Sequence, residues 1–276
     1  MHDLADLLPV TRRSAPLVHF ITNYVTVNDC ANITIAAGGS PIMADDPAES
    51  EDITRLCAAL VLNMGTPCAR TRDAMLAAGQ EANRLGHPVV FDPVGAGASA
   101  FRNSVALDIL RHVRPTVIKG NISEIRFLAE GVGSAKGVGA CPTELVNEAN
   151  LAEALSVARR LHAATGAVIV ISGPIDLVAD GDSAWAVDNG HPMMARLSGT
   201  GCMSAGVIAC HCGAHPGEPL RAALCGMVCM GISGELAHQR LTADEGTGSY
   251  RVRLHDAMSR LDADILRRAC RVRQLA

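Results

Sequence analysis

Aromatic side chains are scarce in this 276-residue chain, which has one Trp, two Tyr and four Phe. So few flat rings exclude a stacking platform for single-stranded nucleic acid, which holds bases against aromatic faces. A basic excess is also missing, because 24 Lys and Arg are outweighed by 28 Asp and Glu. A duplex-binding surface needs such an excess to neutralise phosphates. We therefore expect no nucleic-acid partner.

Long apolar runs are absent as well. The longest, residues 222–233, is interrupted by glycine and is shorter than the roughly 20 residues that a membrane-spanning helix needs. The first residues, from Met1 to Asp6, carry acidic side chains where an export signal would carry basic ones. These features lead us to expect a cytoplasmic protein with no membrane partner.

The ten cysteines include no Cys-x-x-Cys pair, which is the usual spacing of a structural zinc site. The tightest groups are Cys210-His211-Cys212 and the pair Cys225 and Cys229. Four residues apart, the latter two would share one helical face, where thiols commonly pack as small apolar side chains. We interpret these cysteines as packing residues in a reducing compartment, and a metal site as the less favoured alternative.

Short runs rich in Val and Ile alternate with Ala- and Leu-rich segments of helical period, which is typical of an α/β protein. Runs this uniformly apolar suit parallel strands that are covered on both faces. No Pro- or Ser-rich linker divides residues 1–276, so we expect a single domain. The expected strands are residues 59–63, 88–92, 116–120 and 167–172. The expected helices are residues 71–85, 103–112, 143–164, 202–214 and 219–239.

Each expected strand ends in polar or glycine-rich sequence. The endings are Asn-Met-Gly-Thr at residues 63–66, Asp-Pro-Val-Gly-Ala-Gly at 92–97, Gly-Asn-Ile-Ser-Glu at 120–124 and Ser-Gly-Pro at 172–174. Ligands of open α/β sheets bind beyond the carboxyl ends of the parallel strands. Such residues also make ordinary turns, but four endings along one rim predict a binding site.

The sharpest local signal is Ser198-Gly199-Thr200-Gly201-Cys202, which runs into an apolar segment. Its glycines let the backbone approach a ligand closely, and a helix that begins near Cys202 would point free N–H groups at an anion. No Gly-Lys-Ser/Thr follows, so this is not a Walker A loop. We expect the helix terminus to lower the pKa of the Cys202 thiol.

Two acids, Asp92 and Glu124, follow other strands, and Lys119 comes directly before Gly120-Asn121. Magnesium in phosphoryl-transfer sites is usually held by one or two carboxylates, and a lysine supplies a point charge to phosphate. Together with the glycine loop, these residues predict a nucleotide-dependent kinase whose phosphate site is not a P-loop.

At this point the chain resembles the hydroxyethylthiazole kinases of thiamin salvage, within the ribokinase-like superfamily. The resemblance covers roughly residues 19–256, in colinear order. The matching stretches are HFITNYVTVNDCAN from His19, GGSPIMADDPAE from Gly38, ALVLNMGT from Ala59, HPVVFDPVGAGAS from His87, VIKGNISEI from Val117, SGTGCMSAG from Ser198 and GTGSY from Gly246.

The resemblance implies the ribokinase-like fold, a central and mostly parallel sheet with helices on both faces. It also implies phosphorylation of the primary hydroxyl of 4-methyl-5-(2-hydroxyethyl)thiazole, with ATP as the phosphoryl donor and Mg²⁺ as the required ion. Relatives of this kind are trimers that hold the thiazole between neighbouring subunits, so a homotrimer is expected.

Site residues follow from the same resemblance. Cys202 takes the position of an aspartate base in related sugar kinases, and is the expected catalytic residue. Asn23, Met43 and Gly199 would bind the thiazole substrate, and Asp92 and Glu124 would hold the metal. The residues expected to bind ATP are Lys119, Asn121, Ser172, Thr200 and Gly201.

Two alternatives stay open. One is another ribokinase-like kinase of a small alcohol, of the hydroxymethylpyrimidine or pyridoxal type, although these carry aspartate where Cys202 stands and lack TNYVTVNDCAN. The other is a non-catalytic sensor or metal-binding protein built on the Cys and His cluster, which would have no use for the acids and the glycine loop together.

Overall fold

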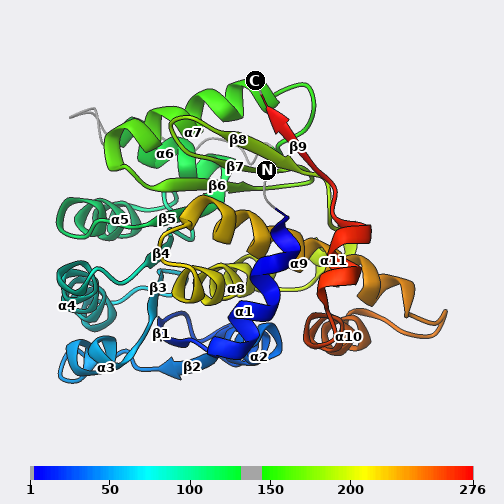
Figure 1. Cartoon of the computed structure of the whole chain (residues 1–276). Helices are drawn as coiled ribbons and strands as arrows, with labels where there is room; N and C mark the ends of the chain where they lie inside the picture. Colours follow the sequence, from blue (N-terminus) through cyan, green and yellow to red (C-terminus); the bar gives the residue numbers. More distant parts are fainter. Residues whose placement is uncertain (1–2, 132–144, 276) are drawn as a thin grey trace.

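The computed structural model describes residues 3–131 and 145–275, and its centre is one nine-stranded sheet (Figure 1). The strands run in the order β2-β1-β3-β4-β5-β6-β7-β8-β9. Pairing is parallel from β2 to β6 and antiparallel from β6 to β9. The strands are β1 (Leu17–Ile21), β2 (Ser40–Met43), β3 (Ala59–Asn63), β4 (Val89–Asp92), β5 (Val117–Asn121), β6 (Val168–Ser172), β7 (Asp176–Ala179), β8 (Ala184–Val187) and β9 (Val272–Leu275).

Helices cover both faces of the sheet, because alternate strand residues point to opposite sides. In β3, Val61 packs into one apolar core, whereas Leu60 and Leu62 pack into the other. Figure 1 shows α3 to α5 on one side of the sheet and α1, α8 and α9 on the other. The helices are α1 (Leu7–Ser14), α2 (Val27–Ala37), α3 (Ser50–Leu56), α4 (Ala69–Leu85), α5 (Ala100–His112), α6 (Ile122–Gly131), α7 (Leu151–Thr165), α8 (Thr200–Ala214), α9 (Pro219–Gln239), α10 (Thr247–Ser259) and α11 (Ala263–Ala269), with short 3₁₀ helices η1 (Leu4–Asp6) and η2 (Pro192–Arg196).

Two helices, α8 and α9, lie in the middle of their layer. Residues 203–212 of α8 and residues 222–234 of α9 are continuously buried, as expected of helices that are apolar on all sides. By length and composition α9 could cross a membrane, but 78% of its apolar window is buried inside the molecule. Such burial is typical of the core helix of a globular protein.

The predicted parallel strands and the helices over 71–85, 103–112, 202–214 and 219–239 are confirmed within a few residues. The predicted helix over 143–164 is wrong at its start: residues 143–144 lie outside the described residues, and the helix begins at Leu151. The side chains of Asn147 and Asn150 accept backbone N–H groups in the preceding turn. These local hydrogen bonds offer the backbone an alternative to helix.

Candidate active site

The polar strand ends converge as predicted. In the sheet register Asn63 of β3 is the partner of Asp92 of β4, and Asn121 of β5 is the partner of Ser172 of β6. All four residues end parallel strands, so their side chains meet at one edge of the sheet. The N-terminus of α8 reaches the same edge, because Lys119 of β5 donates from Nζ to the carbonyl of Gly201 at 3.1 Å.

A chain of hydrogen bonds links the strand ends to the thiol of Cys202. Asn63 donates from Nδ2 to Asp92 Oδ2 at 2.5 Å. Asn23, two residues after the end of β1, donates from its Nδ2 to Asn63 Oδ1 at 2.8 Å, and the same Nδ2 lies 3.4 Å from Cys202 Sγ. Sequence analysis assigned no role to Asn63, although an amide that ends a fully buried strand was a usable signal. The structure therefore brings together three predicted residues and one that was missed.

The glycine loop depends on a left-handed residue. Gly199, the N-cap of α8, has φ +89°, and a Cβ atom there would lie 2.4 Å from Cγ2 of Thr26. No side chain larger than hydrogen fits, so the free N–H groups of the first turn stay accessible. The helix begins at Thr200, two residues before the predicted start, which places Cys202 inside its first turn.

Burial sets the charges around this edge. It raises the pKa of Asp92 to about 7; Lys119 and the hydrogen bond from Asn63 oppose the rise, and Glu124 adds to it. Burial also disfavours the charge of Lys119, but attraction by Asp92, Cys202 and Glu124 outweighs it and raises the pKa of the ammonium. Asp92 and Lys119 therefore stabilise each other as ions.

The expected low pKa of Cys202 is wrong. Burial raises the pKa of this thiol, the negative charge of Asp92 adds to the rise, and Lys119 only partly opposes it. A helix terminus lowers a thiol pKa when water also solvates the thiolate. Cys202 is largely enclosed, so the loss of solvent outweighs the helix terminus.

Glu124 ties two strand-end loops together. Its Oε1 accepts the N–H of Gly95 and its Oε2 accepts the N–H of Asn121, both at 2.8 Å. In return, the N–H of Glu124 donates to Oδ1 of Asn121 at 2.9 Å. Burial is the main cause of the raised pKa of Asp92, and repulsion by Glu124 adds to it. A hard divalent cation that prefers oxygen ligands, such as Mg²⁺, would relieve this repulsion, so the pair fits such an ion.

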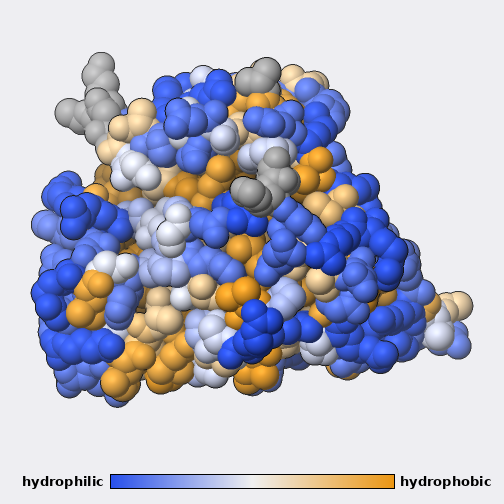
Figure 2. Space-filling view, in the orientation of Figure 1, coloured by the Kyte–Doolittle hydropathy of each residue, from blue (hydrophilic) through white to orange (hydrophobic). Residues whose placement is uncertain are grey.

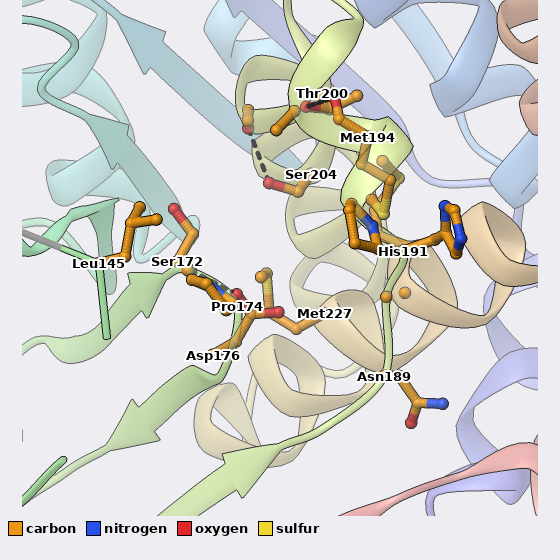
Figure 3. A pocket seen from close by; sticks show the side chains of 17 residues that line it. Leu145, Ser172, Pro174, Asp176, Asn189, His191, Met194, Thr200, Ser204 and Met227 are labelled. Atoms are coloured by element: carbon orange, nitrogen blue, oxygen red, sulfur yellow. Dashed lines mark hydrogen bonds between the residues drawn. The ribbon is translucent and has the colours of Figure 1, made fainter. Parts of the chain in front are cut away.

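A cavity of about 460 Å³ opens beside the loop, between the end of β6, η2 and α9 (Figure 3). Ser172, Thr200 and Gly201 line it together with apolar side chains such as Met227. The Thr200 hydroxyl donates to the carbonyl of Met194 at 3.2 Å. A mostly apolar pocket next to an anion-binding helix terminus suits a nucleotide, whose base is apolar and whose phosphates are anionic.

Met43 lies apart from this group. It ends β2, the edge strand of the sheet, as the register partner of Phe20, and it is 37% exposed. Tyr24 and Val25, which follow Asn23, are 79% and 59% exposed. Figure 2 shows hydrophobic colouring gathered along the lower edge, over the region of α3, β2 and α2 in Figure 1. The predicted substrate side is therefore open at the edge of the chain.

Asp176 is a buried acid that sequence analysis missed. It begins β7, lines the 460 Å³ cavity and accepts the N–H of Gly173 at 2.9 Å. Burial raises its pKa from 3.8 to about 7, against the Gly173 hydrogen bond and the charge of Lys119. The folded protein therefore binds more protons than the unfolded chain between about pH 4 and pH 7, and this group makes the fold less stable as the pH rises through that window.

Replacing Asp176 with Asn should remove this dependence. Asn can still accept the Gly173 N–H but stays neutral, so we expect the free energy of unfolding at pH 8 to exceed that of wild type by about 2–4 kcal/mol. The difference should vanish toward pH 4. Urea denaturation at both pH values measures it. Asp182→Asn, an exposed neighbour in the β7–β8 turn, is the matched control and should change neither value.

Comparison with known proteins places this geometry among kinases. The model of the hydroxyethylthiazole kinase family matches residues 8–264. The hydroxyethylthiazole kinase of Desulfovibrio desulfuricans is 54% identical over 94% of this chain and 93% of its own, and that of Clostridium acetobutylicum is 47% identical over 97% and 98%. The structure of hydroxyethylthiazole kinase from Pyrococcus horikoshii superposes over 100% of both chains with a TM-score of 0.89 and 35% identity.

More distant structures share the architecture alone. The pyridoxal kinase of Staphylococcus aureus, in complex with ADP, has a TM-score of 0.64 at 12% identity, over 94% of this chain and 98% of its own.

Proposed function

The chain belongs to the hydroxyethylthiazole kinase family, and from that membership we propose how its site transfers the terminal phosphoryl group of ATP to the primary hydroxyl of 4-methyl-5-(2-hydroxyethyl)thiazole. The fold is ribokinase-like, and the enzyme is a phosphotransferase. The observation that carries the mechanism is the position of Cys202, in the first turn of α8 and 3.4 Å from Asn23. This arrangement holds an alcohol beside a helix terminus that attracts anions.

In the proposed reaction the substrate oxygen bonds to the terminal phosphorus as the bond from that phosphorus to the bridging oxygen breaks, which releases ADP. The first N–H groups of α8, from Thr200 to Cys202, face the transferring group, and Lys119 adds a fixed positive charge. Phosphoryl transfer passes through a loose transition state, so positioning and charge do most of the work. The thiolate form of Cys202 accepts the hydroxyl proton late in transfer; the neutral thiol that burial favours cannot accept it.

The cavity beside the loop is the proposed nucleotide site. Ser172, Thr200 and Gly201 line it, while Lys119 and Asn121 lie on the strand between it and the acids. Asp92 and Glu124 would hold Mg²⁺, and their mutual repulsion supports that assignment. When bound, the ion neutralises phosphate oxygens.

We also propose that the enzyme is a cytoplasmic homotrimer that binds the thiazole between subunits, next to Asn23, Met43 and Gly199. The apolar side chains left exposed at the β2 edge support this assembly, because a monomer gains nothing from exposing them. The polarisable Met43 thioether suits a sulfur heterocycle. Sedimentation velocity gives the mass directly, and a Met43→Glu variant should sediment as a monomer.

A coupled ADP-release assay with ATP and magnesium tests the activity. We expect rapid release with hydroxyethylthiazole and none above background with hydroxymethylpyrimidine or pyridoxal. Equal release with pyridoxal would contradict the assigned substrate, and release that is indifferent to EDTA would contradict the metal assignment.

The role of Cys202 predicts a pH signature. Because burial raises the pKa of its thiol, the thiolate fraction, and with it kcat, should rise through pH 7–9. Cys202→Asp should keep measurable activity with a shallower rise over this range, since a carboxyl in the same surroundings ionises at lower pH than a thiol. A profile of equal slope in both proteins would show that another group takes the proton. Circular dichroism confirms that the variant is folded.

A further inference from the structure

The largest departure from the expected packing of cysteines is a cluster beneath the N-terminal segment. His211 of α8 and Cys225 and Cys229 of α9 are all fully buried, and their Nε2 and Sγ atoms lie within 4.8 Å of one another. Cys225 Sγ is 3.8 Å from His211 Nε2 and 4.0 Å from Cys229 Sγ. About 13 Å of helix rise separates His211 from Cys202, so the cluster is not part of the proposed active site.

These separations match the edges of a metal tetrahedron. Zn–S bonds of about 2.3 Å and Zn–N bonds of about 2.0 Å at tetrahedral angles put two sulfurs about 3.8 Å apart and a sulfur and a nitrogen about 3.6 Å apart. The two observed distances exceed these values by only a few tenths of an ångström. The third pair, His211 Nε2 and Cys229 Sγ, is within 4.8 Å, so an ion at the centre would draw the ligand atoms closer together.

Thr11 of α1 holds the imidazole of His211 in the orientation that metal binding needs. Its hydroxyl donates to the carbonyl of Leu7 at 3.1 Å, so its oxygen accepts from Nδ1–H of His211 at 2.9 Å. The lone pair of Nε2 therefore faces the two thiols, which are only weak donors. The Cys225 thiol also lies 3.6 Å from the carbonyl of Leu4, to which it can donate. A partner such as Thr11 on the far nitrogen is typical of metal-binding histidines.

We propose that His211 Nε2 and the thiolates of Cys225 and Cys229 bind one zinc ion between α8 and α9. Binding by these three ligands releases two thiol protons to solvent, and two thiolates with one neutral imidazole balance the charge of a divalent ion. A fully buried site with no net charge avoids the main cost of burying ions. Sulfur and imidazole ligands select zinc over magnesium, so the kinase's own ion does not compete.

A fourth ligand is available from the chain. Cys270, half-buried where α11 ends, interacts electrostatically with both Cys225 and Cys229. As a third thiolate it would leave the site with one negative charge, which the positive charges of Arg12 and Arg221 oppose. Helix α9 contacts α1, α8, α11 and the short η1, and Figure 1 shows α1 and α11 beside α9. The ion would thus fasten both ends of the chain to the buried pair α8 and α9.

Metal analysis of the reduced, full-length protein tests the site. We expect about one zinc per chain after purification without chelator, and near-ultraviolet thiolate-to-metal absorption after exchange into Co²⁺. Cys229→Ala and His211→Ala should lose both signals, whereas Cys212→Ala, an equally buried thiol on α8, should keep them. Cys270→Ala should weaken binding by about ten- to a hundredfold and alter the Co²⁺ spectrum.

The zinc content of the wild-type protein tests the proposed site even if a variant fails to fold. Less than about a tenth of an equivalent of zinc, both as purified and after incubation with equimolar zinc under reducing conditions, would overturn the proposal. Zinc retained unchanged in a folded Cys229→Ala variant would overturn it too. Because the site is remote from Cys202, a folded Cys229→Ala variant should keep magnesium-dependent kinase activity.

Discussion

Replacing Gly199 with Ala should lower kcat/KM by about a hundredfold or more, although the substitution removes no functional group. The left-handed backbone, with φ +89°, costs an alanine about 1–2 kcal/mol. The added Cβ would also lie 2.4 Å from Cγ2 of Thr26, so the loop must move. The N–H groups at the start of α8 would then miss the transferring phosphoryl group.

A matched control separates these two effects. Gly166, after α7, also has a positive φ, +73°, but a Cβ there meets no atom of the described residues within 4 Å. Gly166→Ala should therefore lose a similar amount of stability, measured by urea denaturation, yet keep full activity. Adding Thr26→Ser to Gly199→Ala removes the clashing methyl group and should restore part of kcat/KM. Full activity in Gly199→Ala would contradict the role of the loop.

Replacing Asp92 with Asn should lower kcat at least a hundredfold. The change keeps the size of the side chain but removes the charge that stabilises Lys119 and one of the two carboxylates proposed to hold magnesium. Activity measured across magnesium concentrations should show a weaker apparent affinity for the ion. Asp29→Asn is the control, because Asp29 is another buried acid, paired with Arg251 away from the strand ends.

Lys119→Met should lower kcat by a similar factor. The double variant Asp92→Asn/Lys119→Met should lower kcat little more than either single variant, because the two ions act together. Losses that multiply in the double variant would instead mean that Asp92 and Lys119 act independently. A kcat within tenfold of wild type for Asp92→Asn would contradict its assignment as a metal ligand.

Sequence reasoning succeeded where a pattern and its structural cause were both local. The run over 59–63 is uniformly apolar because β3 is covered on both faces, and the strand ends met because parallel strands share an edge. The three strands at the antiparallel end of the sheet were not predicted. The strands β7, β8 and β9 have four residues each, too few to show a period.

What the sequence could not supply was burial by distant segments. The thiol of Cys202 starts a helix, which predicts a low pKa, but enclosure by segments far away in the chain reverses the direction. Asp176 reads as an ordinary turn residue until the cavity is seen around it. The cluster of His211, Cys225 and Cys229 forms only when α8 packs on α9, and the spacing within α9 alone indicates packing.

Because Cys202 is held as a neutral thiol, it should not be the first cysteine of this protein to react with thiol-modifying reagents. Another thiol, Cys68, caps the N-terminus of α4 but is exposed, and hydrogen bonds from Thr71 lower its pKa. Alkylating reagents and peroxides react with thiolates, so they should modify Cys68 long before Cys202. Since its surroundings keep the Cys202 thiol neutral, we expect this kinase to resist oxidants that would inactivate an enzyme with an ionised active-site cysteine.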